Sequence, residues 1–128
     1  MKEKWYRDKL AKKRAKGFQG FPVATVAFYG PDANLATKVS VGIIAREGAD
    51  ADPLERWFSQ EQDVRSNALV LEAVVRFIEQ HAAKSVISLD RIIGCPHEEG
   101  IDYPTGQKCP MCSYWADRDR WSGDLVQP

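Results

Sequence analysis

The chain has no long apolar segment, few cysteines and no net charge. Among its 128 residues, no run approaches the roughly 18 consecutive apolar residues that a membrane helix needs. The N-terminus is charged where a secretory signal peptide has an apolar stretch, and three cysteines cannot all pair within one chain. We therefore expect one small globular domain in the cytoplasm, and neither a membrane protein nor a secreted domain stabilised by disulfides.

The neutral total charge conceals an uneven distribution. Residues 1–16 hold eight Lys and Arg against one Asp and one Glu, a net charge of +6, so the other 112 residues carry −6. A basic segment attracts polyanions through counterion release, which favours RNA, DNA or a ribonucleoprotein as partner. We expect a basic helix and linker in residues 1–20. The predicted nucleic-acid contacts are five cations: Lys9, Lys12, Lys13, Arg14 and Lys16.

One face of this basic helix is aromatic and apolar. Trp5, Tyr6 and Leu10 are spaced to share it. The face is expected to dock either on the protein's own body or on a partner protein, and the sequence leaves both open.

Residues 21–93 are expected to form an α+β core. Strand-forming residues at 23–29 and 36–46 flank a turn sequence at 30–34, which predicts a β-hairpin. The acidic loop that follows is expected to lead into a short helical turn at 53–58. Ser59 and Gln62 have capping-box spacing, and apolar residues then recur every three or four positions from Val64 to Ala82, which predicts a long amphipathic helix. The apolar run at 85–89 predicts a third strand.

The most specific motif lies in residues 94–128, where we expect a zinc-binding module and tail. Two short ligand pairs, one of the form Cys-x-His and one of the form Cys-x-x-Cys, are separated by a turn-rich loop. Thiolate and imidazole are the ligands that Zn²⁺ prefers, and four of them close a tetrahedral site. The second pair resembles the knuckle found in many zinc ribbons. The predicted zinc ligands are Cys95, His97, Cys109 and Cys112.

Three other interpretations of this region are open. A Cys-x-x-Cys pair is also a redox motif, although thioredoxin-like proteins carry it between an early strand and a helix. His97 and Glu99, followed by Cys-x-x-Cys, resemble the zinc nucleobase deaminase signature, which implies a proton-shuttling Glu and a zinc-bound water. Here, however, the intervening loop is short, Lys108 stands where that family has proline, and Cys95 offers a fourth ligand. An acidic cluster that can hold Mg²⁺ in a hydrolase is the third: Asp90, Glu98, Glu99 and Asp102.

The aromatic residues after the knuckle have two interpretations. Trp115 and Trp121 cover the zinc module and pin it to the sheet, or they stack on nucleic-acid bases while Arg118 and Arg120 contact phosphates. The first is favoured, because a small zinc module needs apolar cover. The whole sequence predicts a small protein with a structural zinc site that binds nucleic acid or a ribonucleoprotein, and it favours binding over enzymatic activity without deciding between them. The alternatives are a metal-dependent hydrolase, a nucleotide-modifying enzyme and a protein-interaction adaptor.

Overall fold

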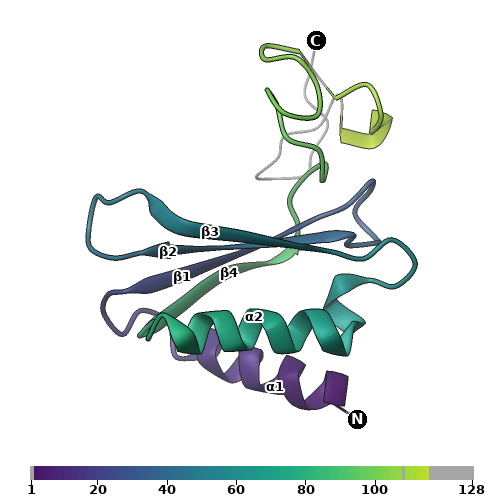
Figure 1. The fold of residues 1–128 in the computed structure, drawn as a ribbon. Helices are drawn as coiled ribbons and strands as arrows, with labels where there is room; N and C mark the ends of the chain where they lie inside the picture. Colours follow the sequence, from purple (N-terminus) through teal and green to yellow (C-terminus); the bar gives the residue numbers. More distant parts are fainter. Residues whose placement is uncertain (1, 108, 116–128) are drawn as a thin grey trace.

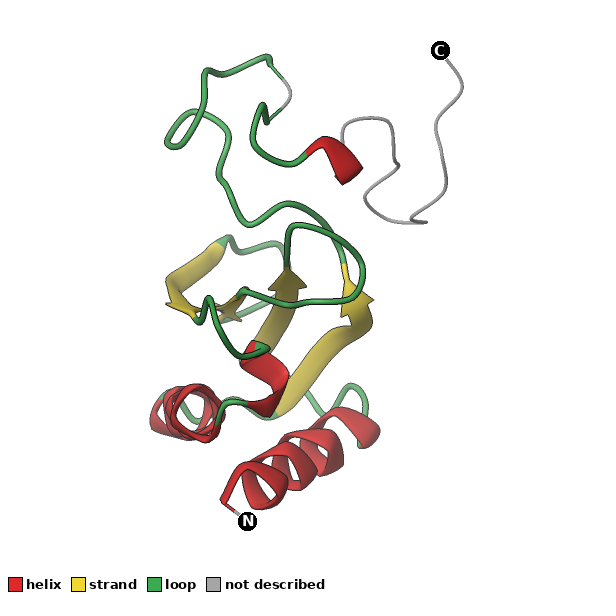
Figure 2. Cartoon of the chain, turned by 90° about the vertical axis from the view of Figure 1, so that its right-hand side faces the viewer, coloured by secondary structure: helices red, strands yellow, loops and turns green. Residues whose placement is uncertain are grey.

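The computed structural model describes residues 2–107 and 109–115. It consists of one four-stranded sheet with two helices on one of its faces (Figures 1 and 2). The elements follow the order α1 (Lys2–Ala15), β1 (Val23–Tyr29), β2 (Lys38–Ile44), β3 (Ala51–Phe58), η1 (Val64–Ser66), α2 (Ala68–Gln80), β4 (Ser85–Ile92) and η2 (Ser113–Trp115). The α+β class is therefore as predicted. Within the described residues, no helix has the length and apolar content needed to cross a bilayer.

The sheet has the strand order β3-β2-β1-β4. β1 and β2 form the predicted antiparallel hairpin, with Val23 opposite Ile44 and Tyr29 opposite Lys38. β4 lies parallel to β1 on its other side, with Val23 opposite Ser85. A parallel neighbour needs a crossover connection, and α2 supplies it across one face of the sheet. The predicted third strand therefore exists, and it continues to Ile92.

Residues 51–58 form a strand, so the predicted short helical turn is wrong. β3 pairs antiparallel with β2, with Phe58 opposite Lys38 and Leu54 opposite Gly42. Pairing along β2 overrides the local helical preference of this segment, as tertiary contacts often do. Pro53 is tolerated because β3 is an edge strand and one side of its backbone needs no ladder partner.

The start of the long helix also differs from the prediction. The expected capping box at Ser59 and Gln62 does not begin it, because α2 starts at Ala68. Asn67 is the cap, and its side-chain oxygen accepts from the backbone N–H groups of Leu69 and Val70 at 3.1 and 3.3 Å. Val64, which the apolar pattern placed in the helix, is instead buried in the separate turn η1. Asn67 can cap α2 because its short side chain reaches two backbone donors of the first turn.

The core lies between the helices and one face of the sheet. Alternate residues of β1 and β2 point toward the helices because side chains of a strand alternate between its faces. The buried residues on that face and on α2 include Ala24, Val26, Phe28, Val39, Val41, Ile43, Val70, Val74 and Ile78. Neither α1 nor α2 lies on the opposite face, which meets residues 94–107 and 109–115 at one end (Figure 1).

Candidate metal centre

The structure brings the four predicted zinc ligands together. One ligand atom from each of Cys95, His97, Cys109 and Cys112 lies within 4.8 Å of all the others. The Nδ1 atom of His97 is 3.1 Å from the sulfur of Cys95 and 3.5 Å from each of the other two sulfurs. Zn–S and Zn–N bonds of about 2.3 and 2.05 Å at the tetrahedral angle give an S–N separation of about 3.6 Å. The observed separations lie close to that tetrahedral edge.

The first ligand pair is positioned by the end of β4. After this strand, the backbone N–H of Ile93 donates to the Phe28 carbonyl, and the N–H of Gly30 donates to the Gly94 carbonyl, both at 2.9 Å. These bonds extend the pairing with β1 up to Cys95, whose side chain is buried. The N–H of His97 then donates to the Cys95 sulfur at 3.3 Å, which turns the chain back over that sulfur.

The second ligand pair is anchored by the aromatic residue that follows it. Cys112 is buried and leads directly into η2. The indole N–H of Trp115 donates to the Gly30 carbonyl at 2.7 Å, and its ring packs against the core. Trp115 therefore pins the metal loop to the sheet, as the favoured interpretation expected. Trp121, Arg118 and Arg120 lie outside the described residues.

The thiols of Cys95 and Cys112 are held in their neutral form by burial and by neighbouring sulfurs. Burial raises the pKa of the Cys95 thiol, and the neighbouring sulfurs of Cys112 and Cys109 raise it further, against the opposing hydrogen bond from the His97 backbone. Burial also raises the pKa of Cys112. Redox chemistry and metal ligation both need the thiolate, so without a cation these cysteines are poor nucleophiles. A cation bound among these sulfurs would stabilise the thiolate form of the cysteines by its positive charge.

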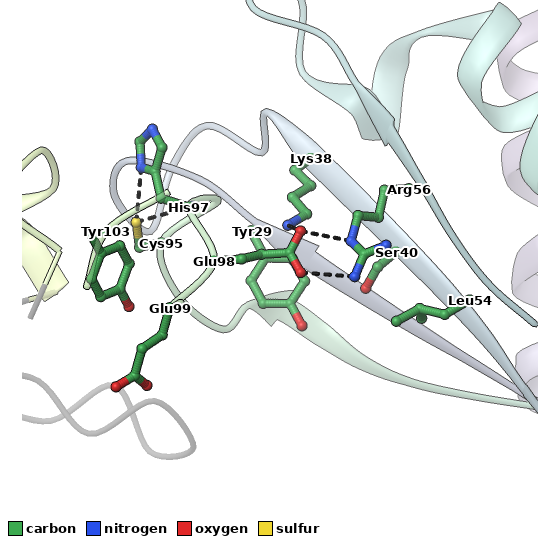
Figure 3. Close-up of a pocket in the computed structure, with 10 residues that line it drawn as sticks. All are labelled: Tyr29, Lys38, Ser40, Leu54, Arg56, Cys95, His97, Glu98, Glu99 and Tyr103. Atoms are coloured by element: carbon green, nitrogen blue, oxygen red, sulfur yellow. Dashed lines mark hydrogen bonds and ion pairs between the residues drawn. The ribbon is translucent and has the colours of Figure 1, made fainter. Parts of the chain in front are cut away.

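Glu98, from the predicted acidic cluster, is bound to two cations of the sheet. One carboxylate oxygen lies 3.1 Å from Lys38 Nζ and 2.7 Å from Arg56 Nε, and the other accepts from Arg56 Nη2 at 2.8 Å (Figure 3). Lys38 is only 4% exposed, and its ammonium also donates to the Pro96 carbonyl at 3.0 Å. Burial by itself raises the pKa of Glu98, but the hydrogen bonds and charges of Arg56 and Lys38 outweigh it and hold the pKa below its usual value.

The other acidic residues have separate partners. Glu99 accepts from the backbone N–H of Gly106 at 2.6 Å, and Asp102 accepts from the N–H of Glu98 at 2.7 Å. The side chain of Asp90 lies outside the described part of the structure. The three described carboxylates thus brace the loop and its contact with the sheet, whereas a Mg²⁺ site needs carboxylates that converge on one point.

A hollow of about 260 Å³ lies between the sheet face opposite α1 and α2 and the start of the metal loop (Figure 3). Tyr29, Leu54 and Tyr103 line it, together with the ion-pair cluster of Lys38, Arg56 and Glu98. Sequence reasoning missed Lys38 and Arg56. The only signal for Lys38 was its place at a wetter position of a predicted strand, which is common on solvated sheet faces. Arg56 lay in the segment predicted to be a helical turn, so nothing in the sequence paired it with Lys38.

The predicted nucleic-acid cations lie on and just after α1, which packs on α2. Lys9 and Lys13 face this neighbour, with their ammonium nitrogens 2.8 and 3.8 Å from a carboxylate oxygen of Glu79. Lys12 and Lys16 are exposed, and Arg14 is half-buried. The helix therefore docks on the protein's own body through part of its basic surface and exposes the rest.

The aromatic face of α1 is divided in the same way. Leu10 packs against the core, whereas Trp5 is 56% exposed and contacts Tyr6 edge to face at 4.6 Å. An adaptor role for Trp5 and Tyr6 stays a prediction.

Comparison with known proteins places the chain in no family. No protein-family model matches it, and neither a curated protein nor a solved structure does. The functional argument therefore depends on the geometry of the described residues.

Proposed function

We propose that Cys95, His97, Cys109 and Cys112 hold one Zn²⁺ ion in a closed structural site. The observation that carries this proposal is the set of three sulfurs at 3.1 to 3.5 Å from a single imidazole nitrogen. Four protein ligands fill a tetrahedral zinc shell, whereas a catalytic zinc keeps one position for water. The ion's role is to fix residues 94–115 against the end of the sheet, where Glu98 and Trp115 already attach them.

Metal analysis of the full chain, purified without added metal, tests this site. We expect one zinc per chain, and X-ray absorption at the zinc edge should show three sulfur neighbours and one nitrogen. Cys112→Ser should abolish stoichiometric zinc, while Ser113→Ala, next to it in the sequence, should leave it unchanged. An oxygen neighbour in the shell of the native protein would contradict the closed site, and absence of metal would contradict zinc binding.

We further infer that the exposed cations of α1, together with Lys16 directly after it, bind nucleic acid or a ribonucleoprotein. The support is physical: residues 1–16 carry +6, and the packing of α1 on α2 presents Lys12 and Lys16 on a folded surface. Lys9, Lys13 and Arg14 reinforce the same positive field. Because such binding releases counterions, it should weaken steeply as salt rises. A cytoplasmic location stays a prediction.

Fluorescence anisotropy with a labelled single-stranded RNA and a DNA duplex tests this inference at several salt concentrations. Lys12→Gln should weaken binding and lower the slope of log affinity against log salt by about 0.7 to 0.9 if Lys12 contacts one phosphate. The matched control is Arg46→Gln, which removes one exposed positive charge from the loop between β2 and β3. Equal losses in both variants, or affinity that does not depend on salt, would contradict a nucleic-acid surface on α1.

A further inference from the structure

The hollow between the sheet and the metal loop has two unlike walls. Figure 3 shows Tyr103 and Glu99 on the loop side and Ser40 and Leu54 on the sheet side, with Tyr29 between them. Its volume of about 260 Å³ lies just below the range of roughly 300–1,000 Å³ that holds drug-sized molecules. The hollow therefore has the size for a ligand of one small ring.

The charged groups that line the hollow already have partners. Lys38 and Arg56 both bind the carboxylate of Glu98, and Glu99 accepts from the backbone N–H of Gly106. Two positive and two negative side chains thus face the hollow, and their formal charges cancel. A charged ligand would have to displace one of these contacts, whereas an uncharged ligand leaves them intact. The lining therefore favours an uncharged ligand.

Two hydroxyl groups on the sheet side can bind such a ligand. Tyr29 and Ser40 lie half-buried on the neighbouring strands β1 and β2, and their hydroxyls make no hydrogen bond within residues 2–107 and 109–115. A hydroxyl both donates and accepts, so this pair matches a ligand that carries hydroxyls of its own. The ammonium of Lys38 lies 5.3 Å from the centroid of the Tyr29 ring, and this cation–π contact holds the ring in place.

Apolar surface in the hollow is limited to Leu54 and the two tyrosine rings. Because Lys38 already lies over the ring of Tyr29, that ring is a poor platform for a stacked nucleobase. The C–H groups of a sugar ring need a smaller apolar contact. We propose that the hollow binds an uncharged sugar ring. The sugar hydroxyls bond to Tyr29 and Ser40, and the C–H groups pack on Leu54 and on the ring of Tyr103. The proposal is independent of the nucleic-acid surface on α1, which lies on the other side of the sheet.

Four probes test the chemistry of the ligand, each titrated into the full chain and followed by amide NMR shifts. Methyl glucoside and methyl riboside are uncharged sugars, glucose 6-phosphate adds a negative charge, and uridine adds a base. We expect at least one glycoside to bind saturably at about millimolar concentration and to shift the amides of Tyr29, Ser40 and Tyr103. Absence of saturable shifts with both glycosides would overturn the proposal. Glucose 6-phosphate binding tenfold more tightly than methyl glucoside would overturn the preference for an uncharged ligand. Uridine binding tenfold more tightly than methyl riboside would replace the sugar by a base.

Three variants that each remove one hydroxyl locate the ligand. Ser40→Ala and Tyr29→Phe should each weaken glycoside binding about threefold to tenfold, with an unchanged circular dichroism spectrum. The matched control is Ser88→Ala on β4, because Ser88 lies outside the lining and its hydroxyl donates to the Leu89 carbonyl. Equal weakening in all three variants, or no weakening by Ser40→Ala and Tyr29→Phe, would contradict the site. The zinc content of each variant separates a loss of sugar binding from a loss of the metal centre.

Discussion

Two substitutions that break the same ion pair should have unequal costs. Glu98→Gln leaves the ammonium of Lys38 buried at 4% exposure without its anion. Removing one partner of a fully buried pair costs about 3–5 kcal/mol. Because the Glu98 side chain is itself 29% exposed, we expect a smaller loss of about 2–4 kcal/mol. Lys38→Met removes the buried charge and leaves Glu98 paired with Arg56, so its expected cost is about 0–1 kcal/mol.

The double variant Lys38→Met/Glu98→Gln sharpens this test. With no buried ammonium left to neutralise, the loss of the carboxylate should cost much less than in the single variant, so the two changes should not add. Urea unfolding of the zinc-loaded protein, followed by far-UV circular dichroism, measures all three free energies of unfolding. Glu55→Gln on β3 is the control for a carboxylate on an exposed residue and should stay within about 0.5 kcal/mol of the native protein. The reasoning fails if Lys38→Met costs as much as Glu98→Gln, or if the two costs add.

Three further outcomes follow from contacts elsewhere in the structure. Trp115→Phe removes the hydrogen bond to Gly30 and should lower the free energy of unfolding by about 1–2 kcal/mol in urea titrations, with zinc stoichiometry unchanged. Asn67→Ala should lower it by about 1 kcal/mol by uncapping α2, measured in the same way. Burial raises the pKa of Asp63, but hydrogen bonds from Arg65 and the backbone outweigh it and hold the pKa below 3.8. Asp63 therefore adds stability above pH 3.8 that is lost as pH falls through its folded-state pKa, so unfolding curves of Asp63→Asn should show a shallower loss in acid.

The parts of the fold that sequence could predict are those fixed by local patterns. The hairpin of β1 and β2 follows from alternating β-branched residues around a turn, and the apolar face of α2 follows from its three- and four-residue spacing. β3 was not predicted because Pro53 and its charged neighbours have weak strand propensity. This segment becomes a strand because it pairs with the edge of β2. The cap at Asn67 was not predicted because the apolar spacing placed Val64 in the long helix. In the structure, Val64 is buried in the separate turn η1, and α2 begins at Ala68.

The metal ligands were visible in the sequence because ligand chemistry restricts them to a few residue types at short spacing. The contacts that hold these ligands in place were not visible in the sequence. Lys38 and Glu98 are 60 residues apart, and Trp115 and Gly30 are 85 apart, so only the folded sheet brings each pair together. Both contacts join the metal loop to the same end of the sheet, where β1 ends and β2 begins.

The two halves of the metal centre depend differently on the core. Backbone bonds from Phe28 and Gly30 extend to the residues just before Cys95, so folding of the sheet places this ligand before any metal binds. Cys109 and Cys112 follow a loop that holds itself mainly by local turns, so their placement depends on the metal together with the Trp115 contact. Ordering that loop costs conformational entropy, which zinc coordination offsets. The sheet is therefore the template on which the metal captures the loop. A chelator should loosen residues 99–107 and 109–114, between the contacts of Glu98 and Trp115, while the four strands and α2 stay folded.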